Sequence, residues 1–244
     1  SPKLSAVIVK NGALDSEYPN LIAELGFTFS YDYRGRLATR RFPGAHTEKF
    51  LYDALDRLVA SGPYPSPFLE DSNEGCIHTK YDVLNRPAYS LWVAGAECIL
   101  PENYYLTGNY GVSESRSSGS SINGVSVGYT NSIVPTYGEV LQVFYYDDYK
   151  YPSAPSSIPS TIKGQAVFFD KDKAPKGLPT STWTRVLETA SQKHGEQTHF
   201  LYDVNQRVIA NLTSHYQGGS TEVHTLFDFS GTVLETETLH KQDA

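Results

Sequence analysis

The stretch Phe29-Ser30-Tyr31-Asp32-Tyr33-Arg34-Gly35-Arg36-Leu37 carries a pattern that returns four more times along the chain. The pattern is an aromatic residue, an aspartate, two variable residues, a turn-forming residue, an arginine and an aliphatic residue. Further copies start at Tyr52, Tyr81 and Tyr202, and a degenerate copy starts at Phe227. Because a unit that repeats along a chain sets its architecture, this repeat is the basis of the fold prediction.

The spacing inside each copy predicts a β-hairpin. Aromatic residues two apart, such as Phe29 and Tyr31, are typical of a half-buried strand. The aspartate then begins a turn, in which its carboxylate can accept backbone N–H groups two residues on. The residue three positions after each aspartate should close the turn. In four of the five copies it is of a type that tolerates the left-handed backbone conformation, which closes a common short hairpin turn. The five residues at this position are Gly35, Asp56, Asn85, Gln206 and Gly231.

The aspartate and the arginine of each copy flank the same turn, and two interpretations stay open. They could form a solvated turn with a weak ion pair worth well under ~1 kcal/mol. They could also form a buried ladder that repeats from hairpin to hairpin. A catalytic residue ordinarily occurs once, so we assign the recurring positions a structural role. They are Tyr31, Asp32, Gly35, Arg36, Tyr52, Asp53, Asp56, Arg57, Tyr81, Asp82, Asn85, Arg86, Tyr202, Asp203, Arg207, Phe227, Asp228 and Gly231.

The motif Tyr-Asp-x-x-(Gly/Asn/Asp)-Arg-(Leu/Val) resembles the YD repeat of the rearrangement-hot-spot (RHS) proteins of bacteria. Flanking stretches are similar to the same family, and they lie at 41–45, 128–131, 145–149 and 228–231. The resemblance implies hairpins joined into a long spiralling sheet that encloses a hollow shell. Known shells hold a toxic C-terminal domain until delivery, and relatives have adhesive or cell-contact roles. The family's self-cleaving aspartate segment, Asp-Pro-x-Gly, does not occur after Asp228, so no protease role is carried over.

The expected fold class is therefore all-β, a twisted antiparallel sheet of consecutive YD-type hairpins with long irregular loops. Residues 1–26 are expected to form a lead-in, with a strand at Ala6–Val9 and a short helix at Tyr18–Leu25. Residues 27–95 are expected to hold three hairpins. Within them the proline-rich segment 62–67 predicts a loop rather than a strand, and Pro87 predicts an edge or a bulge.

Residues 96–175 interrupt the repeat. Ser113–Ser121 is rich in serine and glycine and predicts a mobile surface loop. Tyr151–Pro159 predicts an extended, linker-like arm. Residues 176–244 return to strands: Thr182–Thr189 should pair with Thr198–Tyr202, and a turn at 215–219 should join the last two hairpins.

Composition narrows the function classes. The net charge is −7 with no basic run, so nucleic-acid binding is not expected. No apolar run is long enough to cross a bilayer, so membrane insertion is not expected either. Aromatic residues make up 13% of the chain, which suits cross-strand pairing in a sheet. The chain starts at Ser1 without methionine, so we expect it to be part of a longer, secreted or cell-surface protein that is itself soluble as a fragment.

We predict no active site, metal site or cofactor. The serine-rich stretch at 117–121 lacks the strand-to-helix frame of a Gly-x-Ser-x-Gly hydrolase elbow, and no His-x-x-x-His pair occurs. Four aspartates gather without the spacing of a calcium loop, and they are Asp147, Asp148, Asp170 and Asp172. The two cysteines, Cys76 and Cys98, either form a disulfide in an exported protein or remain as buried thiols.

The favoured function is a non-catalytic wall segment whose partners are the rest of its polypeptide and a cargo domain. The alternative is a surface adhesin that binds a glycan or a protein, with Trp92 and Trp183 stacking on sugar rings. A third possibility is a hydrolase hidden in the loops of 96–160. The open terminal strands of such a fragment predict edge-to-edge self-association.

Overall fold

The computed structural model describes residues 4–7, 26–69, 71–95, 98, 112–169 and 175–242. These residues form strands and turns, and none of them lies in a helix, so the all-β prediction is confirmed. The lead-in strand is β1 (Leu4–Val7), which begins two residues before the predicted position. The helix predicted at Tyr18–Leu25 lies outside the described residues.

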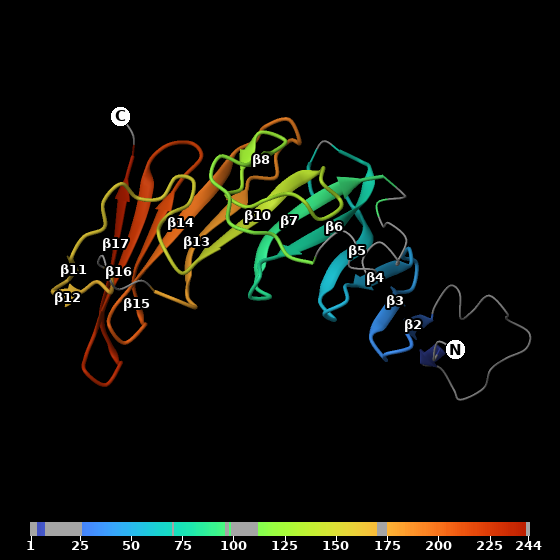
Figure 1. Ribbon diagram of the computed structural model, residues 1–244, viewed down its shortest axis with the longest axis horizontal. Helices are drawn as coiled ribbons and strands as arrows, with labels where there is room; N and C mark the ends of the chain where they lie inside the picture. The colour runs from blue at the N-terminus through green and yellow to red at the C-terminus, as the bar shows by residue number, and fades with distance from the viewer. Residues whose placement is uncertain are drawn as a thin grey trace, which may run out of the picture.

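Thirteen strands form one antiparallel sheet in which sequence neighbours are also spatial neighbours (Figure 1). After β1 they are β2 (Phe27–Tyr31), β3 (Leu37–Arg41), β4 (Glu48–Tyr52), β5 (Leu58–Pro65), β6 (Glu74–Tyr81), β7 (Pro87–Ala94), β10 (Glu139–Tyr146), β13 (Pro179–Arg185), β14 (Gly195–Tyr202), β15 (Val208–Ser214), β16 (Ser220–Phe227) and β17 (Val233–Lys241). Two small hairpins lie apart from this sheet, β8 (Ser121–Ile122) with β9 (Val125–Ser126) and β11 (Thr161–Ile162) with β12 (Gln165–Ala166).

Each of the five repeat copies connects two adjacent antiparallel strands. The aromatic residue ends the first strand and the aliphatic residue, or Pro87, begins the second, as in the pair Tyr31 and Leu37. A register shift immediately before the aromatic residue marks a bulge in all five. All five turn residues have positive φ, including Gln206 at 63°. In each unit the N–H of this left-handed residue donates to the carbonyl of the aspartate three positions earlier, as Gly35 does to Asp32 at 3.0 Å, so each unit is a tight turn between two strands.

Of the two predictions about proline, the one for 62–67 is wrong in part, and the one for Pro87 is confirmed in its second alternative, a bulge. The segment 62–67 is not a loop throughout, because β5 continues to Pro65 across a register irregularity between Ser61 and Tyr64. Because Pro63 lies in this bulge, its missing N–H does not interrupt the strand hydrogen bonds on either side. Pro87 does sit at a bulge, but β7 is not an edge strand, since it lies between β6 and β10.

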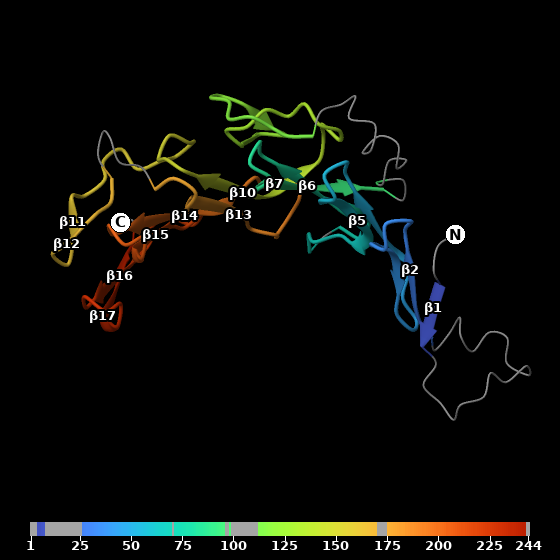
Figure 2. The ribbon, with the colours of Figure 1, turned by 60° about the horizontal axis from the view of Figure 1, so that its bottom comes forward.

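Two segments between sheet strands cover one face of the sheet. We call residues 112–138 the first insertion and residues 148–169 the second insertion. Each contains a two-residue hairpin turn, Asn123-Gly124 in the first and Lys163-Gly164 in the second, with positive φ at all four residues. In Figure 2 the sheet is an arch, with β8 above its middle and β11 and β12 beside its C-terminal end.

The hydrophobic core lies between these insertions and the sheet. It draws buried side chains from β7, β10, β14, β15 and both insertions. Tyr145 stacks on Tyr129 of the first insertion, with ring centroids 6.0 Å apart, and on Tyr151 of the second at 4.6 Å. One prediction is corrected here, because Tyr151 belongs to the core rather than to an extended arm. The predicted surface loop at Ser113–Ser121 is confirmed except at Glu114, which is 0% exposed.

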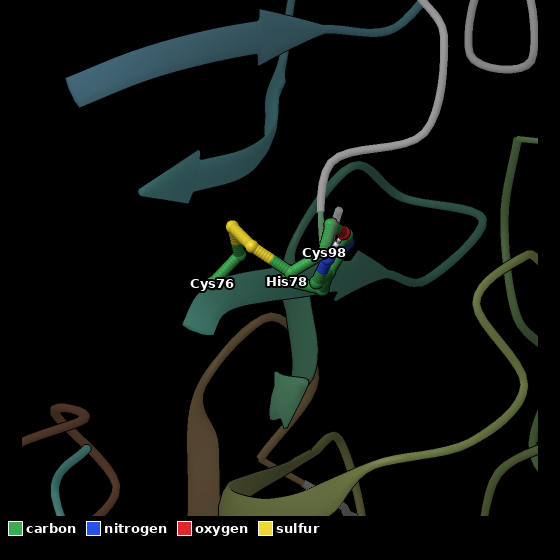
Figure 3. The surroundings of a disulfide bond; sticks show 3 residues. All are labelled: Cys76, His78 and Cys98. Carbon is green, nitrogen blue, oxygen red and sulfur yellow. Dashed lines mark hydrogen bonds between the residues drawn. A yellow bond between two sulfur atoms is a disulfide. The ribbon is translucent and has the colours of Figure 1, made fainter. Parts of the chain in front are cut away.

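Cys76 and Cys98 form a disulfide, which decides between the two possibilities that the sequence left open (Figure 3). Cys76 lies on β6, and the bridge ties this strand to the chain that follows β7. His78 is two residues along the same strand, and its Nε2 lies 2.9 Å from the carbonyl oxygen of Cys98. The bridge and the histidine therefore fasten the same point of the chain to β6.

Candidate functional site

The repeated aspartates organise their own turns. In the first hairpin, Asp32 Oδ1 accepts the backbone N–H groups of Arg34 and Arg36, both at 2.9 Å. Asp32 Oδ2 accepts a hydrogen bond from Arg36 Nε at 2.7 Å. The same three bonds recur at Asp53, Asp82 and Asp203, with Nε to Oδ2 distances of 2.6 or 2.7 Å. Each aspartate thus fixes its turn and aims the arginine that follows.

The arginines then reach the next hairpin. Arg36 lies over the ring of Tyr52, with Cζ 4.4 Å from the ring centroid, and Arg57 lies over Tyr81 at 4.5 Å. Their Nη1 atoms donate to the left-handed turn residue of that next hairpin. Arg36 donates to Asp56 at 2.6 Å and Arg57 donates to Asn85 at 2.8 Å. A cation over an aromatic face contributes about 0.5–2 kcal/mol, depending on its exposure to water.

The tyrosine hydroxyl makes a hydrogen bond back to the hairpin that supplies the arginine. Tyr52 Oη donates to the backbone carbonyl of Leu37 at 3.1 Å, and Tyr81 Oη donates to that of Leu58 at 2.8 Å. Each acceptor is the residue immediately after the arginine that covers the ring. We use the term ladder for this set of contacts: an aspartate that holds an arginine, and an arginine that joins the aromatic residue of the next hairpin.

The ladder continues through a sixth hairpin that the sequence analysis missed. Tyr146 pairs with Pro179 across a register shift, and Asp147 N–H donates to the carbonyl of Leu178. These are the contacts of a repeat turn, but the second insertion and the residues around it separate the two sides. Arg86 lies 4.2 Å over the ring of Tyr146 and donates to both carboxylate oxygens of Asp147, at 3.0 and 2.7 Å.

Tyrosine hydroxyls also join the sixth hairpin to both neighbours. Tyr146 Oη donates to the carbonyl of Pro87 at 3.1 Å, and Tyr202 Oη donates to that of Pro179 at 2.6 Å. The only sequence signal for this hairpin is the dipeptide Tyr146-Asp147, because Leu178 stands where the other copies have arginine. The hydroxyl links therefore run from β3 to β14 across the interruption.

The degenerate last copy keeps half of these contacts. Arg207 lies 4.8 Å over the ring of Phe227 and donates to the backbone carbonyl of Asp228 at 3.0 Å. Phe227 has no hydroxyl to return the link. Thr232 replaces arginine, and its N–H still donates to Asp228 Oδ1 at 2.8 Å. Arg207 therefore joins this hairpin to the preceding one, but this hairpin has no arginine of its own at the equivalent position.

Burial and charge distinguish this ladder from a solvated turn. Asp53, Asp82 and Asp203 are 4%, 5% and 3% exposed, although each carries a carboxylate. Burial acts to raise the pKa of Asp32, but the hydrogen bonds from Arg36 and Arg34 outweigh it and the pKa is lowered. Burial also raises the pKa of Tyr146, to about 12, so its hydroxyl stays protonated and donates. Asp32 therefore remains ionised and paired with Arg36 at neutral pH.

Glu114 is a second polar centre, and sequence reasoning missed it. Its carboxylate accepts the backbone N–H groups of Ser132 and Ile133, at 2.9–3.1 Å, and the hydroxyl of Thr130 at 2.5 Å. Nearby, Lys80 is 3% exposed and donates to the carbonyl of Ile133. Burial lowers the pKa of Lys80 to about 7, against the opposing pull of Glu114. The pair fastens both sides of the first insertion to the sheet.

A carboxylate, an imidazole and a hydroxyl lie in line near the C-terminal end of the sheet. His215 Nδ1 is 2.9 Å from Glu196 Oε1, and His215 Nε2 is 2.8 Å from Thr221 Oγ1. Thr221 Oγ1 is also 2.9 Å from His240 Nδ1. The line joins four structural elements, β14, the 215–219 turn, β16 and β17, and we interpret it as a cross-strand hydrogen-bond chain.

The sugar-stacking residues of the adhesin alternative are corrected by the structure. Trp92 is 2% exposed and cannot offer a ring face to a ligand. Trp183 is only partly buried but packs against the core, where its ring lies against Gly195. The predicted pairing of its strand is confirmed only at Thr182, which lies opposite Thr198. The strand ends at Arg185, and Trp183 lies opposite Gln197, outside the predicted partner segment.

In the described part of the chain, no group of three or more His, Cys, Asp or Glu side chains is placed to hold a metal ion. Over the same residues, no helix has the length and apolar character needed to span a membrane. No protein-family model matches this sequence, and a search of curated proteins finds no match.

Proposed function

We propose that this chain is a non-catalytic structural segment of an exported YD-repeat shell protein, in which it helps to enclose or present a cargo or toxin domain. The observation that carries the proposal is the ladder itself. Each arginine is held by its own hairpin and joins the next one, so the contacts that stabilise a turn also fix the position of its neighbour. A wall can grow from such a unit, because each copy that keeps its arginine offers the next one the same contacts.

The chemistry of the repeat supports a wall rather than a reaction centre. The carboxylates of Asp53, Asp82 and Asp203 are buried under their arginines and have their oxygens occupied by N–H groups. A general base needs an accessible lone pair within reach of a substrate proton. These carboxylates offer none, and their repetition at each turn matches a structural role.

The disulfide supports export. Disulfides form and persist in oxidising compartments and are rare in the bacterial cytosol. Cys76 and Cys98 are both buried, with their Cα atoms 5.5 Å apart. We therefore place the protein outside the producing cell or on its surface, with the rest of its polypeptide and the cargo as partners.

The experiment is protease protection of the complete polypeptide purified from the producing cells. The proposal predicts that any domain without YD repeats resists an added protease in the wild type. The same domain should become sensitive when the ladder is cut by Arg86→Gln. A domain that is digested equally fast in the wild type and in the variant would contradict enclosure, whether or not the segment itself is folded.

A further inference from the structure

The two insertions meet at a cavity of about 480 Å³ on the covered face of the sheet. Its lining contains no residue of the ladder and only one tyrosine of the core, Tyr151. Its volume falls within the range of small-molecule sites, roughly 300–1,000 Å³. The cavity therefore needs an account separate from the wall.

Two cations border the cavity. Arg116, from the first insertion, lies over the rings of Tyr129 and Tyr145, 5.2 Å from each centroid. Its Nη2 donates to the carbonyl oxygen of Lys150 at 2.5 Å and lies 3.6 Å from Asp148. A guanidinium has five N–H donors, so Arg116 can still donate to a ligand beside these contacts. Lys150, from the second insertion, is exposed, and its ammonium has no hydrogen bond or ion pair to any described residue.

Three hydroxyls complete the polar lining. They belong to Ser117, Ser118 and Ser126. None of the three Oγ atoms makes a hydrogen bond to another described residue, whereas Ser120, a neighbour outside the lining, bonds to two backbone carbonyls. Serine hydroxyls both donate and accept, so three of them around one space match a ligand with several hydroxyl groups.

Direct packing of the two insertions holds the walls in place. Gly128 has φ +64°, and a Cβ at this position would lie 2.8 Å from Cδ of Pro152. Tyr151, the residue before this proline, is fixed in the core by its stack on Tyr145 and by a 2.9 Å contact between its hydroxyl and His199 Nδ1. The backbone that carries the cations and hydroxyls is therefore held in place by packing, so a ligand would bind here with little reorganisation of the protein.

We propose that this cavity binds an acidic saccharide, with a uronate-type sugar as the chemical class. The carboxylate would pair with Lys150 and the remaining donors of Arg116, and the sugar hydroxyls would bond to the three serines. Tyr151 and Pro152, which also line the cavity, give the apolar contact that a sugar ring needs. The site requires only the two insertions, so it does not depend on the shell function.

The test is a titration of the ¹⁵N-labelled chain with D-glucuronate, followed by the backbone amide shifts of residues 117–119 and 128. We expect saturable shifts with a dissociation constant on the order of 1 mM, and at least about tenfold weaker binding of D-glucose. Lys150→Glu should weaken glucuronate binding by about tenfold or more. The matched control is Lys176→Glu, which reverses the charge of another exposed lysine outside the lining.

A second variant separates a sugar site from a plain anion site. Ser118→Ala with Ser126→Ala should weaken glucuronate binding several-fold and leave the binding of inorganic sulfate unchanged. The proposal is overturned if glucose binds as tightly as glucuronate, if Lys150→Glu binds like the wild type, or if sulfate alone matches glucuronate. Spectra of the variants that superimpose on the wild type away from the cavity show that the fold is intact.

Discussion

The hairpin of β6 and β7 and the hairpin of β10 and β13 make the same contacts by different routes. In the first, Tyr81, Asp82, Asn85 and Arg86 lie within six consecutive residues, and the turn closes on itself. In the second, Tyr146 and Asp147 meet Leu178 and Pro179 across a long insertion, and the arginine comes from the preceding hairpin. The position of a hairpin in the sheet therefore depends on the ladder and not on the length of its turn.

This difference explains how the sheet accommodates its insertions. A turn that is fixed at its base by Tyr146, Asp147 and Arg86 can carry extra residues without disturbing the strands. Those extra residues then fold back and build the core, with Tyr149 and Tyr151 buried on the sheet. Within the described residues, neither insertion supplies such a cover to the contiguous hairpins between β2 and β5, and most of their side chains are only half-buried.

Arg86→Met should have the largest effect, because Arg86 joins the contiguous hairpin to the interrupted one. It leaves Asp82, whose side chain is 7% exposed, and Asp147 without their cation. Removing one partner of a buried ion pair costs about 3–5 kcal/mol, which urea unfolding would measure. The matched control is Arg34→Met, whose pair with Asp56 is 40% and 56% exposed and should therefore contribute far less to stability. Equal losses in the two variants would contradict the account.

Removal of the disulfide should come next. Cys76→Ala with Cys98→Ala opens a loop with a sequence separation of 22 residues that contains most of β6 and all of β7. Chain-entropy arguments give a loss of about 3 kcal/mol for a loop of this size. Hydrogen exchange should show faster opening of β6 and β7, while β14 to β17, beyond the interrupted hairpin, keep their protection. An equal loss of protection in all of these strands would mean that β6 and β7 do not open independently of β14 to β17.

Acid should destabilise both regions through buried histidines. Burial lowers the pKa of His78 and of His199 to about 4, from an unfolded value of 6.5. Between those values the unfolded chain binds more protons, so stability is lost as pH falls from about 6.5 to about 4. The slope is at most about 1.4 kcal/mol per pH unit for each histidine. Urea unfolding across this pH range should show that His199→Gln and His78→Gln each reduce the dependence of the free energy of unfolding on pH, through β14 and β6 respectively.

The smallest predicted effect is a gain. Phe227→Tyr would restore a hydroxyl to the degenerate hairpin, where Arg207 already covers the ring. A new hydrogen bond to a strand carbonyl contributes about 1 kcal/mol, so thermal unfolding should move upward slightly. The reciprocal change, Tyr81→Phe, removes the bond to Leu58 and should cost a similar amount. A loss in both variants would show that the hydroxyl position is not equivalent in the two hairpins.

The sequence predicts the five contiguous hairpins because their determinants are local. An aspartate, a left-handed residue and an arginine within five positions specify the turn without help from distant residues. The pairing of Thr182 with Thr198 was also predictable, from alternation alone.

What escaped prediction depends on distant partners. Pro179 lies far along the chain from Tyr146, and no periodicity connects them. Glu114 is buried because Ser132 and Ile133 supply N–H groups, which no residue pattern announces. A local signal for the first insertion did exist, since Asn123-Gly124 between Ile122 and Val125 is typical of a two-residue hairpin.

The central claim is that arginine couples each hairpin to the next, and a double-mutant cycle between Arg57 and Tyr81 tests it most directly. The two belong to different hairpins and meet at 4.5 Å, with Arg57 also bonded to Asn85. Urea unfolding of Arg57→Met, Tyr81→Leu and the double variant should give a coupling free energy of about 1–2 kcal/mol. Additive losses, with a coupling below about 0.3 kcal/mol, would contradict the claim that arginine couples each hairpin to the next.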